Sequence, residues 1–401
     1  MTAPYPDVDL TIIGGGIAGL WTLAEARANG IRAILLEKNQ LGCGQTLASQ
    51  GIIHGGAKYS LQGSISKATT AIQAMPARWQ QAYQGEGPVD LSKARVLAST
   101  QYLIPSKGID SQLITFLGSK VMASHSRRIK ARDLPQAYQD CGIDQNLFAL
   151  NETVFDVQSV IRCLYEFHKE AIYQGQLTDN QITPLEKQDG YQLTLSPECT
   201  ITSRFLLWTN GNGAADVAIT QNKLQQRPLH MVMIRGHLPY VYAHWIGRTN
   251  KPLLTVTSHP AGNKKPEQTI WYLGGQLAEE GVQRTEQAQH AHTKQLINHL
   301  LPSIATHSLA ISSYHVNRAE AKQDQQQRPD GAFVRRHGNI LFGWPTKLAL
   351  APQFASKALA LLPQNVTRQP TNNPKSLPEN LTPILPLAKP AIGSMPWDCM
   401  E

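Results

Sequence analysis

The sequence has no uninterrupted run of about 18 apolar residues, the length that a membrane-spanning helix needs. The uncharged segment at residues 10–24 follows Asp7 and Asp9, and acidic residues have the wrong sign for the basic start of a secretory signal. We therefore expect a cytoplasmic protein. The alternative is a peripheral contact with the inner face of a membrane.

Cysteine is scarce, and the sequence has neither the paired spacing of a zinc site nor a Cys-x-x-Cys redox motif. The histidines His230, His237 and His259 are also scattered, so we expect no metal site. A second glycine-rich fingerprint for NADH or NADPH is absent too, which argues against a pyridine-nucleotide disulfide reductase. The cysteines are expected to be reduced thiols at Cys43, Cys141, Cys163, Cys199 and Cys399.

Positive charge is in excess, with 37 Lys and Arg against 29 Asp and Glu and a net charge of +8, but it is dispersed. The basic clusters at residues 127–130 and 335–336 are short, and no recognised nucleic-acid-binding motif accompanies them. We therefore expect no nucleic-acid partner. A solvated basic surface is the ordinary interpretation, and a small anionic substrate is the next.

What the sequence does have is a glycine-rich turn between two apolar segments. Gly14, Gly16 and Gly19 directly follow the apolar residues 10–13, and a second apolar run at 33–36 ends in Glu37. This order of strand, glycine turn, helix, strand and acid is the dinucleotide-binding fingerprint, in which a pyrophosphate lies at the helix N-terminus and the acid binds a ribose. With 401 residues and 41% hydrophobic residues, the chain is long enough for two domains.

The next segment resembles the D-amino-acid oxidase superfamily of FAD-dependent oxidoreductases. Residues 38–59 and 63–68 are most similar to L-2-hydroxyglutarate dehydrogenases and, less closely, to FAD-linked glycerol-3-phosphate dehydrogenases. These families carry a turn of small residues followed by an Ile-His-Gly-Gly-like element against the flavin. Small residues let backbone pack flat on a flavin ring. The resemblance therefore implies FAD as the cofactor.

Further motifs continue the resemblance along the chain. A second glycine turn lies at 210–216, an Arg-Gly strand at 231–237, a Tyr-x-Gly-Gly strand at 270–275, and the last FAD element at 328–331 and 339–352. Fingerprint and resemblance together imply FAD contacts at Gly14, Gly16, Ile17, Ala18, Gly19, Glu37, Lys38, Thr46, Ser49, Gln50, Gly51, Asn210, Gly211, Gly343, Thr346, Lys347 and Leu348.

The expected fold is α/β (α+β), with a Rossmann-like FAD-binding domain and a discontinuous substrate domain on a mixed or antiparallel sheet. The FAD-binding domain is expected at 1–75, 149–216 and 326–362, the substrate domain at 76–148 and 217–325, and a proline-rich tail at 363–401. The local pattern predicts a helix from Arg78, a helix over 160–173, and strands over 95–104, 191–195 and 204–209.

Four side chains are the catalytic candidates. His54 follows the first flavin turn and has the pKa range of a general base; the alternative is a histidine that only hydrogen-bonds the cofactor. Lys58 and Arg235 are candidate carboxylate partners, although a solvated lysine and a strand-end arginine explain them equally. Lys347 would stabilise reduced flavin. Tyr272 and Arg318 are weaker candidates.

These observations predict an FAD-dependent dehydrogenase that oxidises a small anionic 2-hydroxy acid, similar to L-2-hydroxyglutarate, by hydride transfer to flavin N5. The electron acceptor would be a quinone, another carrier or O₂. An amine or amino-acid oxidase of the same superfamily is one alternative, and a non-catalytic flavoprotein binding module is another.

Overall fold

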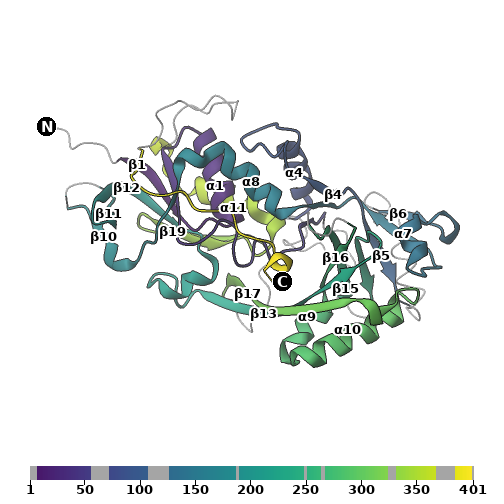
Figure 1. The fold of residues 1–401 in the computed structure, drawn as a ribbon. Helices are drawn as coiled ribbons and strands as arrows, with labels where there is room; N and C mark the ends of the chain where they lie inside the picture. The colour runs from purple at the N-terminus through teal and green to yellow at the C-terminus, as the bar shows by residue number, and fades with distance from the viewer. Residues whose placement is uncertain are drawn as a thin grey trace.

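The computed structural model forms two bodies, each built on an eight-stranded sheet (Figure 1). It describes residues 7–55, 72–106, 126–186, 189–247, 251–262, 267–323, 331–366 and 384–399. We call the sheet that contains the N-terminal strand, with its helices, the first body, and the other sheet with its helices the second body. Among the described residues, every helix is too short or too polar to cross a membrane.

The first body has a five-stranded parallel centre. In spatial order its strands are β9 (Ile172–Gln174), β2 (Ala33–Glu37), β1 (Val8–Ile13), β12 (Cys199–Trp208) and β19 (Ile340–Trp344). After β1 the chain continues to β2, which pairs with β1 on one side, while β12 pairs with β1 on the other side. The strand order therefore reverses beside β1, which is where open α/β sheets bind their ligands.

Helices and antiparallel strands complete the first body. The apolar residues of β1 and β2 are buried on both faces, as a parallel sheet covered by helices requires. The helices are α1 (Ile17–Ala28), α8 (Val157–His168) and α11 (Ala351–Ala360), and the added strands are β10 (Ile182–Pro184), β11 (Tyr191–Ser196) and β18 (Phe333–His337).

The second body is a mixed sheet in which every pair of neighbours is antiparallel except β14 with β5. Its spatial order is β17 (Ala310–Ala321), β13 (Leu224–Gly236), β16 (Thr269–Gly274), β15 (Pro252–Pro260), β14 (Ala243–Ile246), β5 (Gln101–Pro105), β7 (Leu147–Leu150) and β6 (Ser126–Ile129). Its helices are α7 (Gln136–Asp140), α9 (Gln276–Glu280) and α10 (Glu286–Leu300). The expected mixed or antiparallel second sheet is confirmed.

A small three-stranded sheet contains the segment that follows the first glycine turn. It pairs β3 (Ile52–Ile53) with β8 (Thr153–Phe155), and β8 with β4 (Val96–Ala98). The strand expected over 95–104 is thus two strands in different sheets, β4 here and β5 in the second body. Because this small sheet joins distant segments, it fixes the position of His54, which directly follows β3.

Two further local expectations differ from the structure. The helix expected over 160–173 ends at His168, because Ile172 and Tyr173 pair with β2 as a buried edge strand. The residues after 76 were expected in the second domain, yet helix α4 (Met75–Tyr83) packs on the first body. Its Trp79 ring lies 4.7 Å from the ring of Trp21 in α1. The spacing of apolar residues does not predict which sheet a strand joins or which body a helix packs on.

The described part of the C-terminal tail crosses the first body and ends at the second (Figure 1). It adds an isolated bridge between Leu41 and Ile392, and Gln174 N donates to Ala388 O. The Trp397 ring then packs 4.4 Å from the ring of His259. The described tail residues are therefore packed against both bodies.

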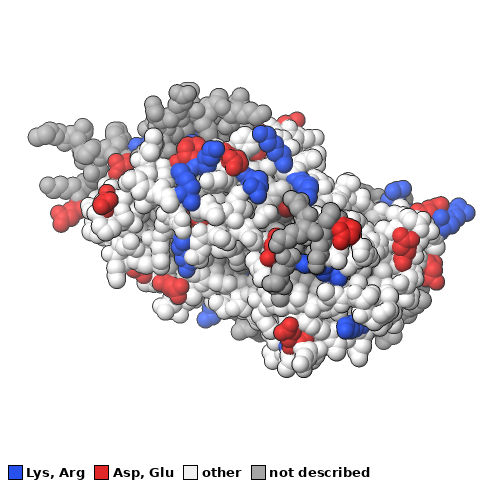
Figure 2. Space-filling model, in the orientation of Figure 1, with Lys and Arg blue, Asp and Glu red and all other residues white. Residues whose placement is uncertain are grey.

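The surface charge is mixed on the face that Figure 2 shows. Lys and Arg groups lie among Asp and Glu groups rather than in one large basic patch on this face. The dispersed basic residues of the sequence therefore remain dispersed in this view.

Candidate active site

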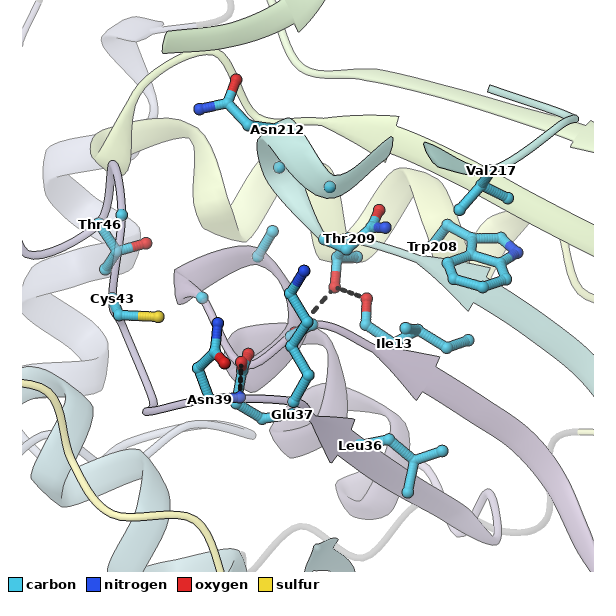
Figure 3. A pocket seen from close by; sticks show the side chains of 18 of the residues that line it. Ile13, Leu36, Glu37, Asn39, Cys43, Thr46, Trp208, Thr209, Asn212 and Val217 are labelled. Carbon is cyan, nitrogen blue, oxygen red and sulfur yellow. Dashed lines mark hydrogen bonds between the residues drawn. The ribbon is translucent and has the colours of Figure 1, made fainter. Parts of the chain in front are cut away.

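The first cavity, of about 390 Å³, lies where the strand order of the first body reverses (Figure 3). The glycines of the fingerprint are required by close backbone approach. Gly14 has φ of 110°, and a Cβ there would lie 2.7 Å from the Asn210 Cα atom. A Cβ on Gly19 would lie 2.1 Å from the Gly14 carbonyl oxygen. The turn and helix α1 can therefore approach the residues that follow β12 only because positions 14 and 19 carry no side chain.

Glu37 organises the turn as well as lining the cavity. Its carboxylate accepts a hydrogen bond from Gly15 N at 2.7 Å. It also accepts one from Asn39 N at 2.8 Å (Figure 3). The side chain is buried, so these charge-assisted bonds are expected to contribute substantially to the local structure. The acid at the end of β2 thus holds the glycine turn and faces the cavity in which a ribose would bind.

The N-terminus of α1 offers an anion-binding surface. Gly16 is the N-cap and supplies no side-chain cap, while Thr46 Oγ1 accepts from Ile17 N at 3.1 Å. Unpaired N–H groups and the positive end of the helix dipole favour a phosphate at such an end. The Thr46 hydroxyl lies at the same place and has a proton to donate.

A second cavity, of about 220 Å³, lies next to the first, since Gln45 lines both. It lies between the two bodies and collects residues from distant parts of the chain. Its walls are Gln45, Ala48, Ser49, Gln50, Gly51, Ile52, His54, Leu229, Met231, Gly274, Gly275, Glu279, Val316, Arg318, Thr346, Lys347 and Leu348.

Buried oxygen atoms in the two cavities lack a hydrogen-bond partner within the described residues. They are Oδ1 of Asn210 and of Asn212 in the first cavity, and Oγ of Ser49 and Oγ1 of Thr346 in the second. Buried polar atoms are normally paired, so unpaired ones in two adjacent cavities indicate a polar ligand. A dinucleotide that extends from the first cavity into the second fits this pattern.

Thr346 adds backbone strain to the second cavity. Its φ is 64°, which makes it the one residue other than glycine with a positive φ among the described residues. Such a conformation costs about 1–3 kcal/mol and is usually found at functional sites. The strained loop places Thr346, Lys347 and Leu348 on the cavity wall directly after β19.

His54 is held by a buried carboxylate. Its Nδ1 lies 3.0 Å from Glu152 Oε2, and Gly55 N donates to Glu152 Oε1 at 3.0 Å. Because a carboxylate only accepts, the proton of the neutral imidazole lies on Nδ1 and the lone pair on Nε2. His54 therefore has a fixed tautomer, as a general base requires.

A second histidine lies behind this pair. The rings of His54 and His244 are 5.7 Å apart, and ligand atoms of His54, Glu152 and His244 all lie within 4.8 Å of one another. His244 and Glu152 are buried. We expected no metal site because other histidines are scattered in the sequence. The present cluster was not recognised there, because its three residues are also far apart in the sequence.

Two cationic side chains line the second cavity, Arg318 and the catalytic candidate Lys347. Arg318 Nη2 lies 3.7 Å from Glu279 Oε1, and Lys251 Nζ lies 2.5 Å from Glu279 Oε2. Burial alone would raise the pKa of Glu279, but Lys251, Arg318 and Arg227 outweigh it and lower that pKa. Glu279 thus stays charged and orients the guanidinium at the cavity wall.

Arg235 lies elsewhere. Its Nη2 donates to the Trp397 carbonyl oxygen at 3.0 Å, and it lines a separate open hollow with His237, Gln268 and Ser303. The structure does not bring Arg235 together with His54. Lys58 lies outside the described residues, as does the segment 63–68. Tyr272 donates to Ala48 O at 2.7 Å and thereby supports, from the second body, a loop that lines the second cavity.

The other predicted cofactor residues divide between the two cavities. The first cavity is lined by Gly14, Gly16, Ile17, Ala18, Glu37, Lys38, Thr46, Asn210, Gly211 and Gly343. The second cavity is lined by Ser49, Gln50, Gly51, Thr346, Lys347 and Leu348. Gly19 packs beneath the glycine turn. Sequence reasoning missed Glu152, His244 and Glu279. None of them lies in a motif, so only their spatial contacts identify them.

Comparison with known proteins agrees with this geometry. Residues 9–342 match the family model of FAD dependent oxidoreductases, DAO. The chain is 40% identical over 389 residues to the probable FAD-dependent oxidoreductase PA4991 of Pseudomonas aeruginosa, covering 96% of this chain and 97% of that protein. The crystal structure of PA4991 has a TM-score of 0.78 to this fold at 34% identity and covers 99% of both chains.

A more distant structure shares the fold alone. L-alpha-glycerophosphate oxidase from Mycoplasma pneumoniae, with FAD bound, has a TM-score of 0.65 at 16% identity and covers 92% of this chain and 98% of that chain. A segment of 51 residues is 43% identical to aerobic glycerol-3-phosphate dehydrogenase of Escherichia coli, which is 13% of this chain and 10% of that protein.

Proposed function

The chain belongs to the DAO family of FAD-dependent oxidoreductases, and on that premise we propose that it oxidises the CH–OH group of a small anionic substrate in the second cavity. A 2-hydroxy acid of the L-2-hydroxyglutarate type is the first candidate. FAD, when bound, accepts the hydride that leaves the substrate carbon. The observation that carries the proposal is an oriented His54–Glu152 pair beside a cavity with the cationic side chains Arg318 and Lys347.

His54 takes the hydroxyl proton in this proposal. Oxidation of an alcohol needs a base, because a hydroxyl group is not deprotonated near neutral pH. With its Nδ1 proton bonded to Glu152, the imidazole accepts the substrate proton at Nε2. The buried carboxylate then stabilises the imidazolium that forms, which favours proton transfer.

Arg318 and Lys347 would hold the anionic groups of the substrate. Arg318 is half-buried, and its contact with Glu279 limits the positions of the guanidinium. A guanidinium binds a carboxylate with two parallel hydrogen bonds, so it fixes orientation as well as charge. Leu229, Met231 and Val316 supply the apolar wall that excludes water from the reacting carbon.

The cofactor would be held by residues of both cavities. Thr46 and the N–H groups of α1 suit the pyrophosphate, Glu37 the ribose, and Ser49 and Thr346 the flavin end. The electron acceptor, whether a quinone, another carrier or O₂, belongs to the same proposal. The proposal also includes a cytoplasmic location, with a peripheral membrane contact as the alternative.

An amine or amino-acid oxidase is the second candidate. Solved structures of glycine oxidase from Geobacillus kaustophilus and L-amino acid deaminase from Proteus vulgaris share the fold at 13% identity. An amine can react already deprotonated and needs no dedicated base. The oriented pair of His54 and Glu152 therefore favours a CH–OH donor over an amine.

Anaerobic bleaching of the flavin tests the proposal. The FAD-loaded protein is mixed with L- and D-2-hydroxy acids, polyol phosphates and amino acids, and absorbance near the flavin maximum is followed. We expect reduction by 2-hydroxy acids first and polyol phosphates second. Reduction by amines or neutral amino acids alone would replace the dehydrogenase with the oxidase, and no reduction by any class would favour a binding module.

A further inference from the structure

His54, Glu152 and His244 form a compact set of metal-binding groups from three separate elements. His54 follows β3, Glu152 precedes β8, and His244 lies in β14. Their ligand atoms lie within 4.8 Å of one another, and Glu152 and His244 are almost completely buried. Two imidazoles and one carboxylate in a buried place are a ligand set typical of zinc.

The groups behind these ligands already fix their orientation. Gly55 N bonds Glu152 Oε1 and leaves Oε2 toward His54, while His244 Nδ1 lies 2.8 Å from Thr255 Oγ1. Metal-binding histidines and carboxylates usually have such outer partners, which raise metal affinity. The second histidine and the carboxylate are therefore held as they would be in a loaded site.

Gln101 provides an independent indication of a ligand. It is fully buried, its Nε2 lies 3.4 Å from His244 Nε2, and its Oε1 has no hydrogen-bond partner within the described residues. A buried amide oxygen without a partner is uncommon. Turning the amide over would bring an oxygen donor beside His244, in reach of a cation or of a water bound to it.

We propose that His54, Glu152 and His244 bind one divalent cation of the zinc class. The ligand atoms of a tetrahedral zinc ion are about 3.4 Å apart, given metal–ligand distances of about 2.1 Å. The observed 3.0 Å between His54 Nδ1 and Glu152 Oε2 is close to this spacing, and His244 would approach by about an ångström. Hard cations such as Mg²⁺ prefer oxygen ligands and should bind weakly.

Cation binding would prevent His54 from acting as a base. This consequence rests on the proposed function. A cation at Nδ1 takes the lone pair of that nitrogen, so the imidazole proton moves to Nε2. The nitrogen that should accept the substrate proton is then a donor. No atom is gained or lost in this change, since the neutral ring only exchanges one tautomer for the other.

Zinc binding can be measured without substrate. The FAD-loaded enzyme is dialysed against micromolar zinc sulfate, with magnesium chloride in a parallel sample, and bound metal per flavin is determined by elemental analysis. We expect one zinc per flavin and no retained magnesium. Glu152→Gln and His244→Asn should each weaken zinc binding at least tenfold while keeping the flavin spectrum.

His290→Asn is the matched control, because His290 lies in α10 and outside the cluster. It should bind zinc as tightly as the unchanged protein. The proposal is overturned if the FAD-loaded enzyme retains no zinc, or if Glu152→Gln and His244→Asn bind it as tightly as the control. Flavin retention in the variants shows that they are folded.

A kinetic measurement separates this site from the proposed function. With an active substrate, zinc should inhibit turnover at the concentration at which it binds, and a chelator should restore it. Stoichiometric binding by the cluster without inhibition would leave the cation site in place and contradict His54 as the base. Absence of turnover with every substrate leaves the binding result unaffected.

Discussion

The two cavities are built in different ways. The first is formed largely by backbone at one sheet edge, where the Gly14–Gly19 turn, Glu37 and the 210–213 turn meet within one parallel sheet. The second is formed by side chains that only the packing of two bodies brings together, such as His54, Arg318 and Lys347. Backbone geometry suits a cofactor shared by many enzymes, whereas in the proposed function the side chains of the second cavity determine the reaction.

The largest expected effect is a loss of turnover without a loss of FAD, which would distinguish the role of the second cavity from that of the first. His54→Ala should lower kcat by about 100-fold or more, the loss expected when a general base is removed. FAD content should remain near one per chain, because the glycine turn, the N-terminus of α1 and Glu37, which would hold most of the FAD, line the first cavity and do not include His54. Steady-state kinetics and the flavin spectrum of the same preparation measure both quantities.

His237→Ala is the control for this substitution, since His237 lies in the separate hollow beside Arg235. Its turnover should be unchanged. Near-normal turnover of a fully FAD-loaded His54→Ala protein would reduce His54 to a packing role and would remove the main argument for a CH–OH substrate.

The next effect tests which arginine holds the substrate. Arg318→Met should raise KM by about 30-fold, equivalent to about 2 kcal/mol for removing one partner of a desolvated charge pair. Arg235→Met should change KM little, because Arg235 bonds the Trp397 carbonyl in a different hollow. Initial-rate measurements on the two variants compare the arginines directly.

The opposite result is equally informative. If Arg235→Met raises KM and Arg318→Met does not, substrate binds outside the second cavity and the sequence-based choice of Arg235 is the better one. FAD occupancy should be equal in both variants, so that a change in KM reports on substrate alone.

A smaller effect belongs to the first cavity. Glu37→Ala should raise the dissociation constant of FAD about tenfold, because it removes charge-assisted hydrogen bonds to Gly15 N and Asn39 N as well as the ribose contact. Fluorescence titration of the apoprotein with FAD measures this constant. Turnover per bound flavin should stay within about twofold, and a large loss of it would show that the two cavities are not separable.

Residues on the walls of both cavities could be named from the sequence, whereas the partners that hold His54 and Arg318 could not, for a physical reason. A phosphate-binding turn requires glycines at fixed spacing, so Gly14, Gly16 and Gly19 identify it locally. Glu152 and His244 have no such spacing, because they reach His54 through strand pairing of β8 and packing of β14. Arg318 and Arg235 look alike in sequence, and only the register of β13 and β17 separates them.

The same limit applies to the fold. The parallel strands 10–13, 33–36 and 204–209 were predictable from continuous apolar runs. The short strand β9 was assigned to a helix, because three residues carry too little pattern to override the preceding helical periodicity. Its partner β2 determines its conformation, and a single sequence does not give that pairing.

A further expected effect is on stability, and it compares one buried histidine in each body. Burial, and to a smaller extent the nearby Arg27, lowers the pKa of His168, at the end of α8, to about 3. Burial likewise lowers the pKa of His259, in β15, to about 3. Both rings are therefore neutral in the folded protein and take up protons when it unfolds at acidic pH.

The sign of the pH dependence follows from these directions. Between the unfolded pKa near 6.5 and about pH 3, the unfolded chain binds one more proton per histidine than the folded chain. The free energy of unfolding should therefore fall as the pH decreases through this window, by up to about 1.4 kcal/mol per pH unit for each histidine. Above pH 7 neither group should contribute to the slope.

Urea unfolding at pH 7.5, 6.0 and 5.0 measures this slope. His168→Gln and His259→Gln should each make it shallower by about one proton, and His307→Gln, on an exposed side chain, controls for the loss of a histidine. Equal effects would mean that both bodies unfold in one cooperative transition, since each histidine then contributes to the same free energy. If only one variant changes the slope, the body that holds the other histidine unfolds separately, and the two bodies differ in stability as well as in chemistry.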